Sequence, residues 1–292
     1  MEQKLKELKA RLQEIFDLSM ANSVLGWDQA TYMPPGGAPA RARQMALLGE
    51  LAHHKSTDAG MGKLIDALIP YGESLPYDSD DASLIRVAKR NFDLQVRIPP
   101  SWVAEFGSHS ALLYQTWTQA RPANDFARVQ AGLEKTLEYS RQMADFFPGY
   151  THIADPLIDL ADYGMRAASI RTLFAELRSQ LVPIVQAITS QPEADRSCIL
   201  QKFPQDAQLA FGKKVIARLG YDFQRGRQDL THHPFMTKFS LGDIRITTRV
   251  NEHDLSDALF GTIHESGHAM YEMGIRMDLE GTPLADGTSA GV

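Results

Sequence analysis

The chain has 292 residues, of which 43% are hydrophobic and 23% are charged, and its formal net charge is −6. This length and composition are typical of a globular protein with a sizeable core, built as one large domain or two. The acidic balance argues against nucleic acid as the main partner, because phosphate binding needs a basic face. A single cysteine, Cys198, excludes an intrachain disulfide framework.

No targeting or membrane segment is visible in the sequence. The first residues, MEQKLKELKARLQEI, are charged and amphipathic and lack the apolar core of a signal peptide. No run approaches the roughly 18 apolar residues that suggest a membrane span. We therefore expect no membrane partner and a cytoplasmic location.

Apolar residues at helical spacing predict a mostly helical body. In the first segment Leu5, Leu8 and Leu12 recur every three or four residues with charges between them. Proline and glycine mark the expected ends, and Pro183 predicts a kink or break in its helix. Ser79 and Ser101 are the expected caps of their helices. Helices are expected over residues 5–27, 38–54, 61–68, 79–98, 101–120, 124–147, 167–189 and 206–219.

The pattern changes after Leu230. Within residues 235–250, two β-rich runs flank Gly242-Asp243, and the second run alternates apolar with polar residues. This alternation predicts a β-hairpin.

A last helix is expected from the cap Asp254 through Met273, with Gly274 as its C′ residue. The predicted fold class is therefore mainly α, a multi-helix body with a small hairpin beside this last helix. We expect a single domain over residues 1–292, with the helical body in residues 1–230 and the hairpin and last helix in residues 231–292.

The last helix carries the pattern H-E-x-x-H at His264, Glu265 and His268. Two histidines four residues apart leave the same helix face one turn apart and can bind one zinc ion. Glu265 is placed to take a proton from a zinc-bound water. The alternative is a helix with three solvated polar residues.

The third metal ligand is not identified by spacing. The extended pattern with a third histidine fails, because Tyr271 and Gly274 occupy its glycine and histidine positions. Glu272 continues the same helix face, but three ligands along a straight helix cannot converge on one ion. It is better suited to accept a histidine N–H, or it is simply solvated. The acidic residues Asp278, Glu280 and Asp286 follow in the next turn, and nothing in the spacing selects one.

Four segments carry a resemblance that covers the whole chain. They are LGWDQATYMPPGGAPARARQMALLGELAHH (residues 25–54), HPF (233–235), DIRITT (243–248) and ALFGTIHESGHAMYEMG (258–274). Together they resemble the thermostable metallocarboxypeptidases of the carboxypeptidase Taq type. The resemblance implies a mostly helical fold with a deep cleft and a homodimer. It also implies release of C-terminal amino acids from peptides, with broad specificity, by a metal-activated water.

Members of that family are longer than this chain. In them a glutamate just beyond the position of Val292 supplies the third metal ligand. We therefore expect the chain to correspond to the N-terminal part of such an enzyme. The alternative is an inactive helical scaffold or dimerisation fragment with an incomplete two-histidine site. Zinc is the expected metal, and cobalt or another divalent ion is possible.

A carboxypeptidase needs a cation for the substrate's terminal carboxylate. Arginine suits this role because its guanidinium can donate two parallel hydrogen bonds to one carboxylate. Arg245 is the leading candidate, with an ion pair to Asp243 as the alternative. Asp243 is otherwise a candidate support for the metal site. His233 is a candidate donor to the substrate, or a structural loop histidine. Thr247 lies in the same strand segment and joins the candidate substrate-binding residues.

Two other nucleophiles are weaker candidates. The segment GTSAG (residues 287–291) matches the G-x-S-x-G elbow, but Ser289 lacks the preceding strand and the following helix that this elbow needs. Cys198 has no local feature of a nucleophile and is expected to be a small core residue.

Overall fold

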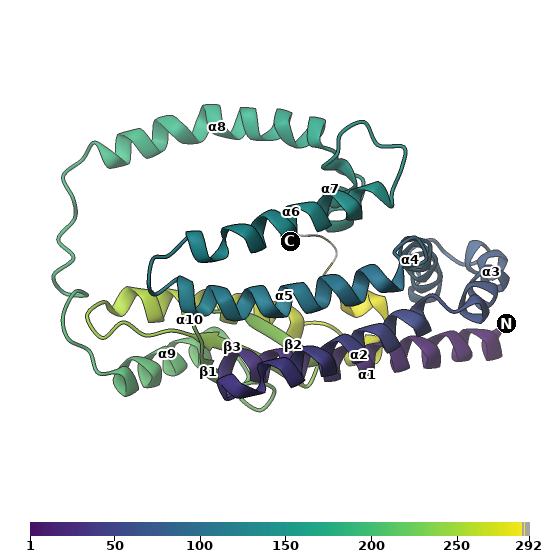
Figure 1. Ribbon diagram of the computed structural model, residues 1–292, viewed down its shortest axis with the longest axis horizontal. Helices are drawn as coiled ribbons and strands as arrows, with labels where there is room; N and C mark the ends of the chain where they lie inside the picture. The colour runs from purple at the N-terminus through teal and green to yellow at the C-terminus, as the bar shows by residue number, and fades with distance from the viewer. Residues whose placement is uncertain (288, 290–292) are drawn as a thin grey trace.

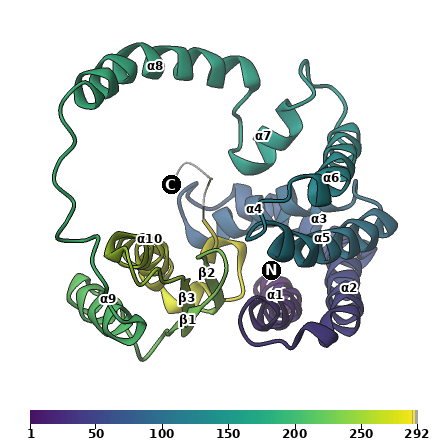
Figure 2. The same ribbon diagram turned by 60° about the vertical axis from the view of Figure 1, so that its left-hand side comes forward.

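The structure is a computed structural model and describes residues 1–287 and 289 (Figures 1 and 2). Its helices are α1 (Glu2–Thr31), α2 (Ala38–Ser56), α3 (Ala59–Glu73), α4 (Asp80–Gln95), α5 (Pro100–Ala120), α6 (Ala127–Asp145), α7 (Asp155–Ala161), α8 (Ala167–Thr189), α9 (Gln205–Leu219) and α10 (Leu255–Met273). Three short 3-10 helices are η1 (Pro35–Gly37), η2 (Met277–Leu279) and η3 (Pro283–Ala285). The strands are β1 (Gln228–Leu230), β2 (Met236–Ser240) and β3 (Asp243–Thr248). The mainly α fold class is confirmed.

Helix ends follow the local chemistry, with some corrections to the prediction. Ser79 caps α4, because its side chain accepts a hydrogen bond from the Ala82 N–H. Ser101 does not cap α5. That helix begins at Pro100, since a proline in the first turn has no N–H to leave unpaired. The helix α3 does not stop at Pro70 but continues through it to Glu73.

Pro183 lies inside α8 without ending the helix. The expected break is therefore wrong. Pro183 removes one helical hydrogen bond, but this stretch of α8 is exposed, so water can reach the carbonyl that the proline frees.

Two clusters of buried apolar residues form the core. The first joins α1, α3 and α4 through residues such as Leu8, Ile65 and Leu84. The second joins α9, β3 and α10, and its fully buried members include Ile216, Ile246 and Ala269. The second cluster fixes the helix that carries the metal motif.

The sheet has the strand order β1-β3-β2. The predicted hairpin is the antiparallel pair β2–β3, in which Lys238 lies opposite Ile244. The parallel strand β1, paired with β3 so that Gln228 lies opposite Ile246, was not predicted. Only three residues long, β1 is too short to show an alternating pattern. Helix α10 packs on one face of the sheet and the C-terminal part of α1 on the other.

Helix α8 stands apart from the other elements in both views and is joined to α9 by residues 190–204 (Figures 1 and 2). Ala167, its first residue, is its one buried residue. Across the described residues, no helix is both long and apolar enough to cross a membrane.

Candidate metal centre

Helix α10 is seated on the sheet by a buried polar contact as well as by apolar packing. The Gln228 side chain of β1 donates to the Thr262 hydroxyl at 2.7 Å, and that hydroxyl donates to Thr248 of β3 at 3.3 Å. All three side chains are buried. The motif residues one turn further along α10 therefore project from a helix whose rotation is fixed.

The two histidines of the motif lie side by side on the exposed side of α10. Their Nε2 atoms are 3.2 Å apart, and their ring centroids are 4.8 Å apart with nearly perpendicular planes. Zinc–nitrogen distances of about 2.0–2.1 Å and tetrahedral angles place two ligand nitrogens about 3.3–3.4 Å apart. His264 and His268 therefore fit two adjacent corners of a tetrahedral metal site.

Glu265 is the buried member of the motif, with 8% of its surface exposed. Burial raises the pKa of Glu265 above its ordinary value, against the opposing influence of His264, His268, His233 and the Met236 backbone N–H. A carboxylate poised in this way is suited to accept a proton near neutral pH.

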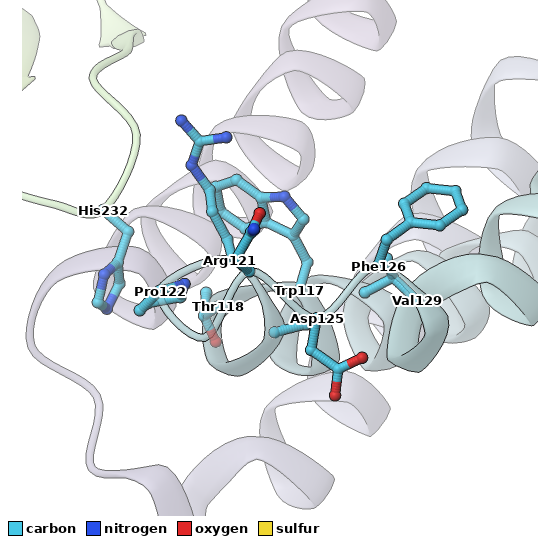
Figure 3. Close-up of a pocket in the computed structure, with 10 residues that line it drawn as sticks. Trp117, Thr118, Arg121, Pro122, Asp125, Phe126, Val129 and His232 are labelled. Carbon is cyan, nitrogen blue, oxygen red and sulfur yellow. The ribbon is translucent and has the colours of Figure 1, made fainter.

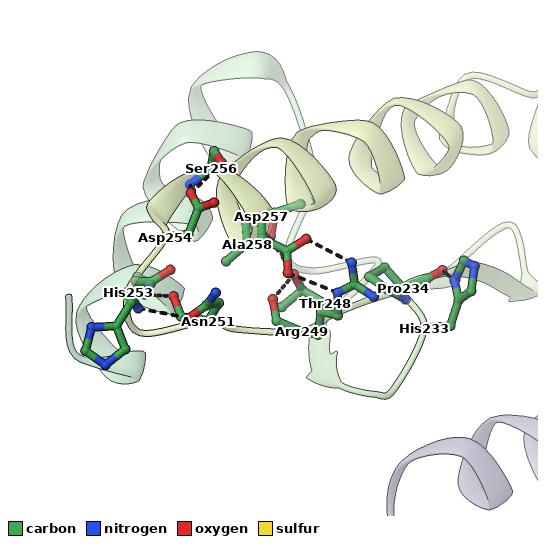
Figure 4. A network of polar contacts seen from close by, with 12 residues as sticks. His233, Pro234, Thr248, Arg249, Asn251, His253, Asp254, Ser256, Asp257 and Ala258 are labelled. Atoms are coloured by element: carbon green, nitrogen blue, oxygen red, sulfur yellow. Dashed lines mark hydrogen bonds and ion pairs between the residues drawn. The ribbon is translucent and has the colours of Figure 1, made fainter. Parts of the chain in front are cut away.

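The motif opens onto a pocket of about 580 Å³, lined among others by His233, His264 and Glu265. The start of α10 forms one wall of this pocket, and hydrogen bonds hold it in shape (Figure 4). Arg249 pairs with Asp257 at 3.0 Å, and Asp254 caps the helix by accepting the Ser256 N–H at 2.9 Å.

Among the described residues, no three histidine, cysteine or acidic side chains gather as a metal site. Glu272 accepts a hydrogen bond from Lys238 at 2.7 Å, and Asp286 pairs with the same lysine at 3.2 Å. Glu272 is thus engaged by a lysine, and the support that it was expected to give a histidine is not seen.

The other two acidic candidates are engaged elsewhere. Asp278 pairs with Arg276 at 3.0 Å, and Glu280 accepts the Leu241 N–H at 2.6 Å. Among the described residues, His264 and His268 are therefore the candidate ligands that the fold brings together, and none of these acidic side chains is seen beside them.

Arg245 and Asp243 lie away from the histidines. They form a two-point ion pair, with Arg245 Nε and Nη2 at 2.8 and 2.7 Å from the Asp243 carboxylate. The guanidinium also lies 4.7 Å from the Trp27 ring centroid of α1. In β3 their side chains alternate with Ile244 and Ile246, which contact α10, so they face the opposite side of the sheet. This arrangement favours the structural alternative for both residues.

Of the other two candidate substrate-binding residues, Thr247 makes a structural contact and His233 lines the pocket of the motif. Thr247 is fully buried, and its hydroxyl exchanges hydrogen bonds with the backbone of Phe235 at 2.8 and 3.0 Å. It therefore holds the two strands of the hairpin together. His233 lines the pocket beside Glu265, with Nδ1 2.8 Å from the Pro234 carbonyl. Of the candidate substrate contacts, His233 is the one that the fold brings to the motif.

A second hollow, of about 550 Å³, lies at the turn between α5 and α6 (Figure 3). Its wall includes Trp117, Arg121 and His232, which neighbours His233. The Trp117 ring lies 6.3 Å from the ring of His233, so the two hollows flank one loop.

The structure gives no support to the two weaker nucleophile candidates, Ser289 and Cys198. The segment 287–291 lies largely outside the described residues. Cys198 is exposed in the connection between α8 and α9 and is not the core residue expected, because no residue of that connection belongs to the two apolar clusters found in the described part of the chain.

Comparison with known proteins identifies the family. The profile of the carboxypeptidase Taq (M32) metallopeptidase family matches residues 7–292, and the chain belongs to this family. Carboxypeptidase 1 of Bacillus subtilis is 34% identical over 288 residues, which cover 98% of this chain and 57% of that protein. Thermostable carboxypeptidase 1 of Thermus thermophilus is 33% identical over 287 residues, covering 94% and 56%.

Solved structures agree with the fold. The crystal structure of the M32 carboxypeptidase from Deinococcus radiodurans has 46% sequence identity and a TM-score of 0.86, covering 99% of this chain and 58% of that one. The crystal structure of BsuCP has 33% identity, a TM-score of 0.94 and the same coverage. The chain thus spans less than three fifths of the length of the relatives it matches. The family is a metallopeptidase family, which implies a divalent metal.

Sequence reasoning missed the contacts that support the motif. Three side chains from or near the sheet hold α10. Gln228 donates to Thr262 in the middle of the helix, and Lys238 donates to Glu272 near its C-terminal end. Arg225 donates to the Met273 carbonyl at 3.0 Å. In the sequence, the one feature that could have indicated these contacts is the presence of polar residues within or next to short strands.

Proposed function

We propose that this chain carries the metal-binding helix and the general base of a divalent-metal-dependent carboxypeptidase, which releases C-terminal amino acids from peptides. The observation that carries the proposal is the geometry of α10. Two histidine Nε2 atoms lie 3.2 Å apart on its exposed side, with the buried carboxylate of Glu265 between them in sequence. The activity of the curated relatives, which are named carboxypeptidases, supports the same reaction.

The residues divide the work as follows. His264 and His268 hold the metal ion through their Nε2 atoms. When bound, such an ion polarises the scissile carbonyl and lowers the pKa of a coordinated water. Glu265 accepts a proton from the attacking water and delivers it to the leaving amine. His233, on the pocket wall, donates a hydrogen bond to the substrate.

Zinc suits this donor set best, because imidazole nitrogens in tetrahedral geometry are typical of zinc sites. Cobalt has similar preferences and is the natural spectroscopic substitute. A pocket of about 580 Å³ that is lined by both polar residues and apolar residues such as Pro234 and Phe260 is consistent with broad side-chain specificity. We propose peptides as substrates, a second copy of the chain as partner and the cytoplasm as location, as the family resemblance implies.

Hydrolysis of a blocked dipeptide, with and without added Zn²⁺, tests the proposal. We expect metal-dependent release of the C-terminal residue and a loss of about 10²–10⁴-fold in Glu265→Gln. Glu176→Gln on α8 makes the same chemical change on an exposed side chain and should retain activity.

Two results would contradict the proposal. One is hydrolysis that persists in Glu265→Gln, because the general base would then lie elsewhere. The other is stoichiometric metal binding without any hydrolysis, which would favour the alternative of an inactive helical scaffold. The named relatives lend that alternative no support.

A further inference from the structure

A cavity of about 780 Å³ lies between α3, α4 and α7, and we call it the α4 pocket. Its lining shares no residue with the pocket of the metal motif. Ile69, Ile85, Leu94 and Phe147 contribute apolar wall. Two of the helices that frame it, α3 and α4, lie next to each other in Figures 1 and 2. The metal chemistry makes no use of this cavity.

Cationic side chains from α4 dominate the polar wall of the α4 pocket. Arg86 and Arg90 are four residues apart and share one face of the helix, and Arg97 follows just beyond its end. In the part of the chain that the structure describes, none of these three guanidiniums forms an ion pair. Lys89, by contrast, is neutralised by Asp66 at 3.1 Å and Asp93 at 2.9 Å.

Aromatic rings orient two of the guanidiniums. The Arg86 guanidinium carbon lies 3.9 Å from the centroid of the Tyr77 ring, and that of Arg90 lies 3.9 Å from the Tyr163 ring. A ring that stacks on the flat face of a guanidinium leaves the N–H groups in its plane free to donate. Arg86 Nη2 already donates to the Ser83 hydroxyl at 3.0 Å, so the remaining N–H groups of Arg86 and the terminal N–H groups of Arg90 are the donors left for an acceptor.

Arg90 has unused donors. Its Nε is buried and has no hydrogen-bond partner, and its Nη2 makes one long bond of 3.4 Å to the Asp159 carbonyl. Because the buried Nε is covered by protein, a ligand in the cavity has to bind the terminal N–H groups of Arg90, whose one hydrogen bond within the described part of the chain is this long one.

Most of the carboxylates in the pocket wall are already paired with other cations. Asp159 is bound by Arg166 at 2.5 Å, and Asp93 by Lys89. Glu73 is the remaining lining carboxylate, and it is exposed to water. The free charges of the α4 pocket are therefore three guanidiniums against one hydrated carboxylate, in a chain whose net charge is −6.

We propose that the α4 pocket binds an organic phosphate, with the phosphate between Arg86 and Arg90 and the apolar body against Ile69 and Leu94, which are half-buried. A phosphate offers more acceptor oxygens than a carboxylate, which is filled by a single arginine fork. Two or three guanidiniums that line one pocket match the larger group. Glu73 is left to accept a hydrogen bond from a hydroxyl or amine of the ligand.

Calorimetric titration of the full chain with phenyl phosphate tests the proposal. We expect saturable binding that weakens at least tenfold in Arg86→Gln and in Arg90→Gln. Arg90→Lys keeps the charge but loses the fork, so it should weaken binding by an intermediate factor. Arg141→Gln removes the same charge from an exposed position on α6 and should bind like the unaltered chain. Circular dichroism of each variant confirms that it is folded.

Parallel titrations define what the α4 pocket recognises. Inorganic phosphate should bind more weakly than phenyl phosphate, and benzoate more weakly still. Equal binding of inorganic phosphate would overturn the role of the apolar wall, and tighter binding of benzoate would overturn the choice of phosphate. The whole proposal fails if phenyl phosphate does not bind, or if Arg86→Gln and Arg90→Gln bind it as Arg141→Gln does.

Discussion

Helices α8 and α10 have similar lengths, 23 and 19 residues, and both carry many apolar residues, yet the fold uses them in opposite ways. Helix α10 buries Ala258, Thr262, Ser266 and Ala269 against the sheet and α9. Helix α8 buries Ala167 alone. An amphipathic pattern therefore indicates that a helix has a face that can be buried. Whether that face is buried depends on another element packing against it.

The exposed apolar side of α8 is extensive. Its members are more exposed than a packed helix allows: Leu173, Phe174, Leu177, Leu181, Val182, Ile184, Val185 and Ile188. Contiguous apolar surface of this kind marks a contact surface in most proteins. Under the proposed function helix α10 needs the opposite property, because His264 and His268 would have to keep a fixed separation to bind one ion.

The first prediction concerns the packing under α10, where the expected loss of stability is largest. Ile246 is fully buried beneath α10, so Ile246→Ala should lower the free energy of unfolding by about 2–5 kcal/mol. Urea unfolding measures the change. A loss below about 1 kcal/mol would show that the cluster under α10 is not tightly packed.

The second prediction concerns the base of α8. The Ala167 N–H donates to the Asp155 carboxylate at 2.8 Å and holds the pKa of Asp155 below its ordinary value, helped by the His152 N–H and opposed by burial. The stabilisation is fully present above the unfolded pKa of about 3.9 and is lost as the pH falls through the lower native pKa.

Hydrogen exchange at the first turn of α8 measures this effect. Protection should fall in acid below about pH 4 in the unaltered chain. Asp155→Asn should show the weakened protection already at neutral pH, with little further change in acid. Asp78→Asn, an exposed position, serves as the control. An acid response in Asp155→Asn equal to that of the control would assign the loss to other groups.

The third prediction is the smallest. Leu177→Ala removes an apolar side chain of α8 that is 51% exposed, so the free energy of unfolding should change by less than about 0.5 kcal/mol. Urea unfolding, run beside Ile246→Ala, gives the comparison. A loss of 2 kcal/mol or more, roughly the cost of a buried leucine, would mean that α8 is covered in solution.

The sequence predicts α8 and α10 about equally well as helices. The range of α8 was predicted in full, and the cap Asp254 and the end at Met273 locate α10. The sequence does not predict that α8 stays uncovered, because periodicity reports a face and not its partner. Of the kink or break predicted at Pro183, the break is wrong, since the cost of an interior proline depends on exposure, and the kink stays a prediction.

The candidate site shows the same division. His264, Glu265 and His268 follow from spacing alone, because a helix fixes their directions. The roles expected of Arg245 and Glu272 depended on which partner each would meet. Arg245 meets its strand neighbour and α1, and Glu272 meets a lysine from β2, contacts that no local pattern encodes.

The most direct test of the central claim is a calorimetric zinc titration of the full chain. The claim is that α10 presents His264 and His268 as a preset pair of metal ligands. We expect one zinc ion per chain, with affinity reduced at least tenfold in His264→Ala and in His268→Ala and unchanged in His253→Ala, an exposed histidine just before the helix. Zinc binding that is equally strong in all three variants would contradict the claim.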